Sequence, residues 1–339
     1  MKLEKSTIEA MFLSERKLLK VPEYLAISMK EYAKVVYDIA NVCMLKKNAP
    51  YIISCYSREV LPRMFEETCL VADIHYIEFL ADFAHWKRLK EKSVIEAIFC
   101  KYQRNHYLHT NNIVNATFYE WLIRDKNYNL PHFSAEDYQE GFLINSVALM
   151  HEIMHFVKGF EENYGALFRE HNIDKHVQNA DESIVEGNCD YMAILILLEK
   201  GIGIEIPQEQ IVDKYFQMMA ANCLYKTIIE SDTKDKGEKS AVKDLMDRVF
   251  ATISFLYGMK NLTPNLDMDK INLDTLAIST EGLMSIAHFI DTQMRDLAKE
   301  FNNLPEDYKD SIYNNLNKQE KKLQTQKEFI VYPEIIIQA

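Results

Sequence analysis

The sequence predicts a mainly α-helical protein with a small β component, and three observations support that fold class. Glycine and proline, which interrupt regular structure, number only 9 and 8 among 339 residues. Apolar residues recur mostly three and four positions apart, which is the spacing of one face of a helix. The hydrophobic content of 48% is enough for a large buried core. We therefore expect a folded protein built mostly of helices.

The first region, residues 1–133, is expected to be mostly helical with short strands, and to pack on the rest of the chain or form part of it. Its longest predicted helix covers residues 61–90. The run PYIISCYS at 50–57 predicts one strand. The run NNIVNATFYEWLI at 111–123 is rich in β-branched and aromatic residues, and it predicts a second strand beside the functional site.

One run inside the predicted helix, ADIHYIEFLADFAHW, contains His75, Glu78, Asp82 and His85 at spacings that suit a metal bound across a helix. A two-metal bundle needs a matching run on a partner helix, and the sequence shows none. We interpret the run as an amphipathic helix with a polar face.

The second region, residues 134–339, is expected to contain two helices that carry the functional residues. Ser134, followed by acidic residues, predicts a helix from there to about residue 158, with Gly159 at its end. The run ESIVEGNCDYMAILILLEK at 182–200 predicts the other helix, capped by Asn179 or Asp181 and stopped by Gly201. Further helices follow, with a charged loop at 231–240. The end of the chain, EFIVYPEIIIQA, predicts a docked strand or extended tail.

Charge and cysteine content exclude several classes of protein. Residues 1–100 are nearly neutral, with 15 Lys+Arg against 14 Asp+Glu, so the formal charge of -12 arises after them. A nucleic-acid partner held on a broad basic surface is not expected. The six cysteines form no CxxC pair, which argues against a disulfide framework and a cysteine zinc ribbon.

The distribution of apolar residues predicts no membrane span. No stretch reaches the roughly 18 uninterrupted apolar residues that a span needs. Charged residues also interrupt residues 1–20 before a signal-peptide core could form. We expect a cytoplasmic protein.

The run HEIMH at 151–155 carries the clearest chemistry. On a helix, His151 and His155 fall about 40° apart on one face, where two imidazoles can reach one metal ion. Glu152 points to the side of that ion, where a carboxylate can take a proton from a metal-bound water. A hydrolytic zinc site usually takes a third protein ligand. Glu186 is our candidate.

The third ligand lies in the run EGNCD, where Glu186 and Asp190 share a helical face. Asp190, one turn later, is placed to accept the free N–H of a ligating histidine and fix its tautomer. Glu182 competes as the third ligand because it lies four residues before Glu186. We favour Glu186, since only Glu186 has an aspartate one turn on.

HEIMH followed by EGNCD resembles the gluzincin class of zinc metallopeptidases, over about residues 144–196. The resemblance implies a zincin-like metallopeptidase core with extra helices, Zn²⁺ bound by His151, His155 and Glu186, Glu152 as general base, and Asp190 beside a ligand. The long helical region before the motif and the expected cytoplasmic character are similar to those of bacterial intracellular members such as Lit-type phage-exclusion peptidases or ImmA-like regulatory proteases. The spacing before Glu186 is longer than in thermolysin-like members and a GxMEN signature is missing, which disfavours an aminopeptidase.

The resemblance also implies a donor to the developing oxyanion, for which Tyr164 and His288 are the candidates. The expected activity is zinc-dependent hydrolysis of a peptide bond in a protein or peptide substrate. Two alternatives stay open: a zincin-fold regulatory or sensor protein that binds metal without turnover, and a zinc hydrolase of a non-peptide amide or ester. The sequence does not indicate an oligomeric state.

Overall fold

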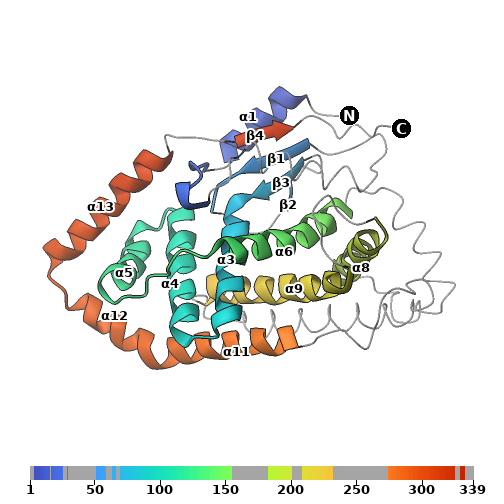
Figure 1. The fold of residues 1–339 in the computed structure, drawn as a ribbon. Helices are drawn as coiled ribbons and strands as arrows, with labels where there is room; N and C mark the ends of the chain where they lie inside the picture. The colour runs from blue at the N-terminus through green and yellow to red at the C-terminus, as the bar shows by residue number, and fades with distance from the viewer. Residues whose placement is uncertain are drawn as a thin grey trace.

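The computed structural model describes residues 4–15, 17–25, 29, 51–58, 63–65, 69–154, 182–200, 208–231, 274–324 and 329–332. The chain is mainly helical with a small sheet, which confirms the predicted fold class (Figure 1). Its elements are α1 (Lys5–Glu15), the 3-10 turn η1 (Glu23–Leu25), β1 (Tyr51–Cys55), β2 (Arg63–Phe65), β3 (Cys69–Asp73), α3 (Ile74–Leu89), α4 (Lys92–His109), α5 (Ile113–Asp125), α6 (Ala135–Met154), α8 (Glu182–Lys200), α9 (Gln208–Glu230), α11 (Asp274–Phe289), the π-turn η4 (Ile290–Met294), α12 (Arg295–Asn302), α13 (Glu306–Gln324) and β4 (Phe329–Tyr332).

The four strands form one mixed sheet in the order β2-β3-β1-β4. β1 runs parallel to β3, with Ile53 opposite Val71, and antiparallel to β4, with Ile53 opposite Val331. In the view of Figure 1, this sheet lies above α3, α6 and α9 and below α1. The strand predicted at 50–57 and the docked C-terminal strand are both confirmed. Because β4 completes a sheet of earlier strands, residues from both predicted regions share one core.

Helices α3 and α6 form the most extensive helix pair of the described structure. α3 begins directly after β3, where the Asp73 side chain caps it by accepting the backbone N–H of His75 at 3.0 Å. Every residue from Ile74 to Trp86 is buried. α6 approaches α3 closely at Gly141, where a Cβ would lie 2.6 Å from the backbone nitrogen of Ala81. A glycine is therefore required at this crossing.

The single helix predicted over residues 61–90 is wrong in its first half. Residues 63–65 and 69–73 form the adjacent strands β2 and β3, and the helix starts only at Ile74. The run Cys69–Asp73 is buried throughout. A short, continuously apolar run fits a fully buried strand as well as a buried helix, so periodicity alone could not place this boundary.

The strand predicted over residues 111–123 is also wrong, because this run forms helix α5. The Asn112 side chain accepts a backbone N–H three residues later, which starts the helix. The aromatic side chains that suggested a strand pack instead across helices, with the rings of Phe118 and Trp121 each centred 5.4 Å from that of Phe301. Tertiary packing here outweighs the intrinsic strand preference of these residues.

The predicted polar face of α3 is a buried polar cluster instead. The exposed fractions of His75, Glu78 and Asp82 are 0%, 0% and 1%. The α4 side chain of Lys101 lies 2.7 Å from Glu78 and 2.6 Å from Asp82, so the two carboxylates share one ammonium group. Single-helix periodicity could not show this burial, because the covering groups come from other elements.

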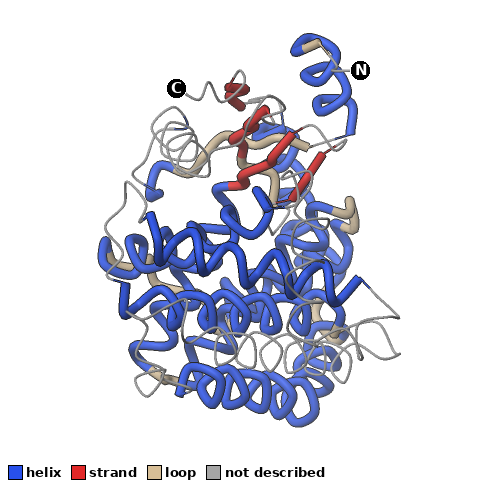
Figure 2. Tube along the Cα trace, turned by 90° about the vertical axis from the view of Figure 1, so that its right-hand side faces the viewer, coloured by secondary structure: helices blue, strands red, loops and turns tan. Residues whose placement is uncertain are grey.

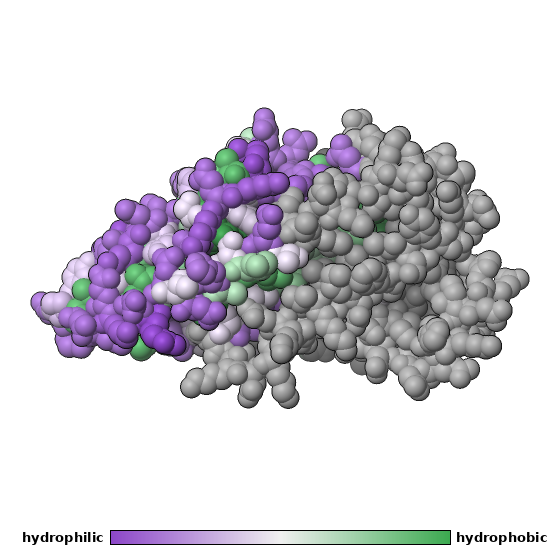
Figure 3. Space-filling model, turned by 90° about the horizontal axis from the view of Figure 1, so that it is seen from below, coloured by the Kyte–Doolittle hydropathy of each residue, from purple (hydrophilic) through white to green (hydrophobic). Residues whose placement is uncertain are grey.

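Most of the helices stack in layers beneath the sheet in the view of Figure 2, and the helix next to the N-terminus lies at its top. Among the described residues, no helix is long and apolar enough to cross a membrane. The described part of the face in Figure 3 is mostly hydrophilic, with isolated hydrophobic residues. The five described cysteines, Cys55, Cys69, Cys100, Cys189 and Cys223, are all buried.

Several sequence-based expectations fall on residues outside the described ranges. These are the helix end at Gly159, the caps Asn179 and Asp181, the stop at Gly201, the charged loop from residue 232 on and the tail after residue 332.

Candidate metal centre

Helix α6 carries the first half of the motif and begins where the sequence predicts. The Ser134 hydroxyl accepts the backbone N–H of Asp137 at 3.1 Å, and the Asp137 carboxylate accepts the backbone N–H of Ser134 at 3.0 Å. This reciprocal pair satisfies two donors at the helix start. The same carboxylate accepts two hydrogen bonds from Arg88, at 2.9 and 3.1 Å, and lies 2.8 Å from His85 Nδ1 on α3. The start of α6 is thus fixed to α3.

The ionisation of Asp137 follows from these contacts. Burial opposes the charged form, but the hydrogen bonds from Arg88, His85 and Ser134 outweigh it and hold the pKa of this carboxyl well below its usual range. Asp137 is therefore ionised at neutral pH. Together with the close crossing at Gly141, this anchor sets where the last turn of α6 lies.

The last turn of α6 presents His151 and Glu152. His151 is buried, with 6% of the residue exposed. The Glu152 side chain is 20% exposed, and its Oε1 atom lies 4.0 Å from His151 Nε2. A carboxylate in that position is close to the imidazole nitrogen and still open to a small molecule such as water.

Helix α8, predicted over residues 182–200, is present with those bounds and brings two carboxylates to the same imidazole. Glu186 Oε2 lies 3.0 Å from His151 Nε2, and Asp190 Oδ1 lies 2.8 Å from His151 Nδ1. Glu186 and Asp190 occupy one face of α8 because they are four residues apart. Each ring nitrogen of one histidine therefore faces its own carboxylate.

This arrangement requires more positive charge than a neutral imidazole supplies. A neutral ring has one N–H and can donate to only one of the two carboxylates. The other contact is favourable if a second proton is present, on the ring or on the carboxyl group, or if a metal ion lies between the two atoms. Two ligands of a tetrahedral zinc ion with bonds of about 2.0–2.1 Å lie roughly 3.3 Å apart. The 3.0 Å between His151 Nε2 and Glu186 Oε2 is close to that value.

Asp190 is held in turn by a residue that the sequence did not suggest. Asp190 and Tyr215 are both 0% exposed, and the Tyr215 hydroxyl donates to Asp190 Oδ2 at 3.1 Å. The two oxygens of one carboxylate thus face His151 and Tyr215. No motif marks Tyr215, because it lies on α9 among other apolar residues, and its role depends on how α9 packs against α8.

Among the remaining candidate residues, the structure describes the side chain of His288 alone. His155 and Tyr164 lie outside the described residues, as does the side chain of Glu182. Within the described residues, no three His, Cys, Asp or Glu side chains are grouped so that they could hold one metal ion, and the predicted ligand His155 is not among these residues. His288 is exposed near the end of α11, which packs on α9 and α4. Since α9 lies between α6 and α11 in Figure 1, a role for His288 beside His151 has no geometric support.

Comparisons with known proteins give no further guide to this site. No family model matches the chain, and no curated protein or solved structure is significantly similar to it.

Proposed function

We propose that this protein is a zinc-dependent metallopeptidase with a zincin-like core, which hydrolyses a peptide bond in a protein or peptide substrate. One observation carries the proposal: the two ring nitrogens of His151 each face a carboxylate of α8, with Glu186 on one side and Asp190 on the other. The motifs HEIMH and EGNCD are separate in sequence, and the fold places His151 of the first against Glu186 and Asp190 of the second.

The residues present fit a zinc ion. His151 Nε2 and Glu186 Oε2 are a nitrogen and an oxygen ligand at a separation close to that of two zinc ligands. His155, which follows the last residue of α6 and lies outside the described residues, is the third proposed ligand. When bound, the ion would polarise the scissile carbonyl and lower the pKa of its bound water.

The chain's own groups have distinct roles in this proposal. Asp190 Oδ1 lies 2.8 Å from His151 Nδ1, where its negative charge favours the tautomer that carries its proton on Nδ1 and leaves Nε2 to bind the ion. Tyr215 keeps Asp190 in that orientation. Glu152, whose carboxylate lies beside Nε2 and is partly open, takes the proton of the attacking water and returns it to the leaving amine.

Metal content is the first test of this proposal. The purified full-length chain and the variants His155→Ala, Glu186→Ala and His288→Ala would be loaded with zinc, dialysed and measured by elemental analysis. We expect one zinc per wild-type chain, a large loss in the first two variants, and full retention in His288→Ala, which replaces an exposed histidine far from the site. A wild type that stays metal-free after loading would overturn the proposal.

Turnover is the second test. Wild type and Glu152→Gln would each be incubated with a peptide mixture from a digested proteome, and new peptide ends would be counted by mass spectrometry. General base catalysis contributes about 10²–10⁴-fold, so Glu152→Gln should keep its zinc and lose cleavage by about that factor. If both proteins bind zinc and neither cleaves any peptide, the result would favour a metal-binding regulatory protein over a peptidase.

A further inference from the structure

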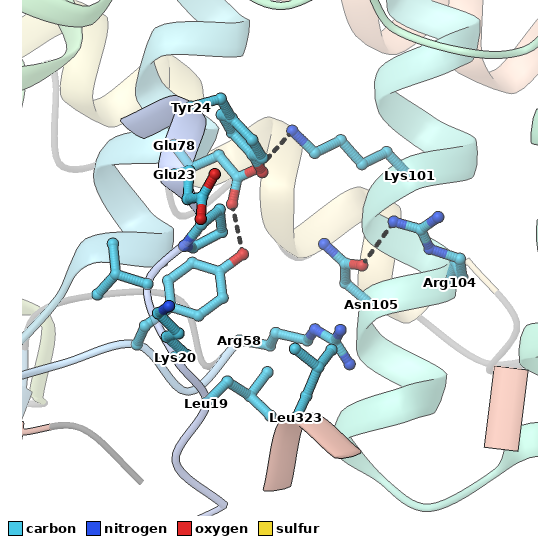
Figure 4. A pocket seen from close by; sticks show the side chains of 13 residues that line it. Leu19, Lys20, Glu23, Tyr24, Arg58, Glu78, Lys101, Arg104, Asn105 and Leu323 are labelled. Carbon is cyan, nitrogen blue, oxygen red and sulfur yellow. Dashed lines mark hydrogen bonds and ion pairs between the residues drawn. The ribbon is translucent and has the colours of Figure 1, made fainter. Parts of the chain in front are cut away.

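A pocket of about 290 Å³ opens over the buried polar cluster of α3 (Figure 4). Its walls come from residues 19–24, Tyr56, Arg58, α3, α4 and the end of α13, and they include no residue of the proposed metal centre. Its volume is close to the lower limit for small-molecule sites, which measure about 300–1,000 Å³. Several separate segments therefore converge on a space for one small molecule.

The charged residues that line the pocket are mostly cationic. They are four cations and two acids: Lys20, Arg58, Lys101, Arg104, Glu23 and Glu78. The carboxylates that hold the two arginines are not part of the lining, since Arg58 Nη1 lies 2.8 Å from Glu320 and Arg104 Nη1 lies 2.9 Å from Glu120. In both pairs the cation borders the pocket and the acid does not. A guanidinium group has five N–H donors, so Arg58 keeps donors beyond its contact with Glu320.

The buried acid of the lining has no free acceptor. Glu78 is 0% exposed. Its Oε1 accepts the hydroxyl of Tyr24 and lies 2.7 Å from Lys101. Its Oε2 accepts the hydroxyl of Tyr56 at 2.7 Å and lies 3.1 Å from His75 Nδ1. Both oxygens are occupied, so Glu78 offers no site for a cationic ligand.

The lining also contains a buried donor that lacks an acceptor. Asn105 is 3% exposed, and its side-chain oxygen accepts a hydrogen bond from Arg104 Nη2 at 3.2 Å. The amide nitrogen therefore points the other way, into the pocket (Figure 4). Within the described part of the chain, this nitrogen has no hydrogen-bond acceptor. Because buried polar groups are normally hydrogen-bonded, it requires an acceptor from a molecule in the pocket.

The rest of the lining is apolar or exposed. Leu19, Val21 and Leu323 supply hydrocarbon surface. Lys20 and Glu23 are both exposed and opposite in charge, and water and salt screen them. The inner lining thus combines hydrogen-bond donors with apolar surface.

We propose that this pocket binds a small organic carboxylate that carries an apolar group, independently of the proposed metal centre. Its carboxylate accepts hydrogen bonds from Asn105 and Arg58, while Arg104 keeps Asn105 in place. A planar carboxylate matches guanidinium and amide donors. Its apolar group packs against Leu19 and Leu323. Inorganic phosphate would fill little of the pocket and would leave this apolar surface in contact with water.

The test is calorimetric titration of the full-length chain with hexanoate and isocaproate. Isocaproamide, which has the shape of isocaproate without its charge, and inorganic phosphate serve as matched ligands. We expect both carboxylates to bind at millimolar or lower concentration. The amide and phosphate should bind at least about tenfold more weakly, since a hydrogen bond to a charged group contributes that much or more. Glu186→Ala, which alters the proposed metal centre, should bind the carboxylates as wild type does.

Two variants of the lining complete the test. Asn105→Asp keeps an oxygen for Arg104 and replaces the donor with a negatively charged oxygen, so it should weaken carboxylate binding about tenfold or more. Urea unfolding would establish that this variant is folded. Lys20→Glu changes an exposed charge, which leaves folding intact, and should weaken binding about twofold to fivefold. Lys226→Glu, an exposed substitution on α9 outside the pocket, is its matched control and should bind as wild type does.

Four results would overturn the proposal. They are the absence of binding by either carboxylate, equal binding of isocaproamide or phosphate, loss of binding in Glu186→Ala, and binding as in wild type by a folded Asn105→Asp. If Asn105→Asp does not fold, equal affinities of Lys20→Glu and Lys226→Glu would overturn it instead.

Discussion

The two buried polar clusters of this protein place a side chain between a pair of carboxylates in different ways. In the α3 cluster, the Lys101 ammonium group lies between Glu78 and Asp82 and supplies the positive charge that both need. At the proposed metal centre, the imidazole of His151 lies between Glu186 and Asp190. An ammonium group is charged by itself, whereas a neutral imidazole satisfies only one carboxylate.

This difference separates a structural ion network from a candidate metal site. In the α3 cluster, Lys101 supplies a permanent positive charge to both carboxylates, and burial raises the pKa of Asp82 to about 6, which eases the cost of the second negative charge. The proposed metal centre needs a proton or a metal ion on the Nε2 side. The same residue types therefore support different roles, and the identity of the central group decides between them.

The largest expected effect is the removal of the central cation from the α3 cluster. Lys101→Met leaves two buried carboxylates without their counter-charge, and losing one partner of a buried ion pair costs about 3–5 kcal/mol of unfolding free energy. Urea unfolding of the zinc-free protein would measure the loss. Zinc content should not change, because Lys101 belongs to the other cluster.

Two further variants make this prediction specific. Lys92→Met removes an exposed lysine of the same helix, which pairs with Glu96 at 3.4 Å, and should change stability by less than about 0.5 kcal/mol. Adding Asp82→Asn to Lys101→Met should recover part of the loss, because one uncompensated charge is removed. Equal stabilities of Lys101→Met and Lys92→Met would show that the cluster is not held by its central charge.

The sequence was informative where chemistry depends on spacing within a helix. His151 with Glu152, and Glu186 with Asp190, are close along the chain, and helix geometry alone fixes their relative directions. The bounds of α8 were predictable because a continuous periodic run defines the helix. The contacts of Glu186 and Asp190 with His151 depend on how α6 packs against α8. The spacing of the motifs suggested that the two helices meet, but it could not give their relative position.

The sequence was uninformative where a role depends on contacts between distant elements. Tyr215 meets Asp190 across 25 residues, and Lys101 meets Asp82 across 19. Nothing in the local pattern distinguishes these residues from ordinary core or surface positions. The same limit explains the errors at residues 69–73 and 111–123, where burial by neighbouring elements decides between strand and helix.

The second-largest expected effect concerns the hydroxyl of Tyr215 at the proposed metal centre. Tyr215→Phe removes the hydroxyl that holds Asp190, and loss of a group that orients a ligand typically costs about 10–100-fold in metal affinity. Chelator competition would measure the zinc affinity. Tyr225→Phe, which changes another buried tyrosine of α9, is the matched control and should bind zinc as wild type does. Equal affinities in the two variants would leave Tyr215 with a packing role only.

The smallest expected effect concerns the anchor that connects the two clusters through α3. Asp137 fixes the start of α6, which carries His151, to His85 and Arg88 on α3, the helix that also carries Glu78. Asp137→Asn keeps an acceptor for the Ser134 backbone N–H but removes the charge, so we expect a loss of about 1 kcal/mol of unfolding free energy at neutral pH.

Acid should abolish this difference, and the sign follows from the depressed pKa. Because the pKa of Asp137 is lower in the folded chain than its ordinary value of 3.8, its ionised form contributes stability above that pH, and the contribution is lost as the pH falls below it. Unfolding curves of wild type and Asp137→Asn should therefore converge on acidification, while Glu136→Gln, an exposed neighbour, should follow wild type throughout. If the difference in unfolding free energy between wild type and Asp137→Asn persists in acid, the charge of Asp137 does not stabilise the fold and its side chain contributes by packing alone. If that difference disappears in acid, the charge of Asp137 stabilises the attachment of α6 to α3, and with it the position from which His151 reaches α8.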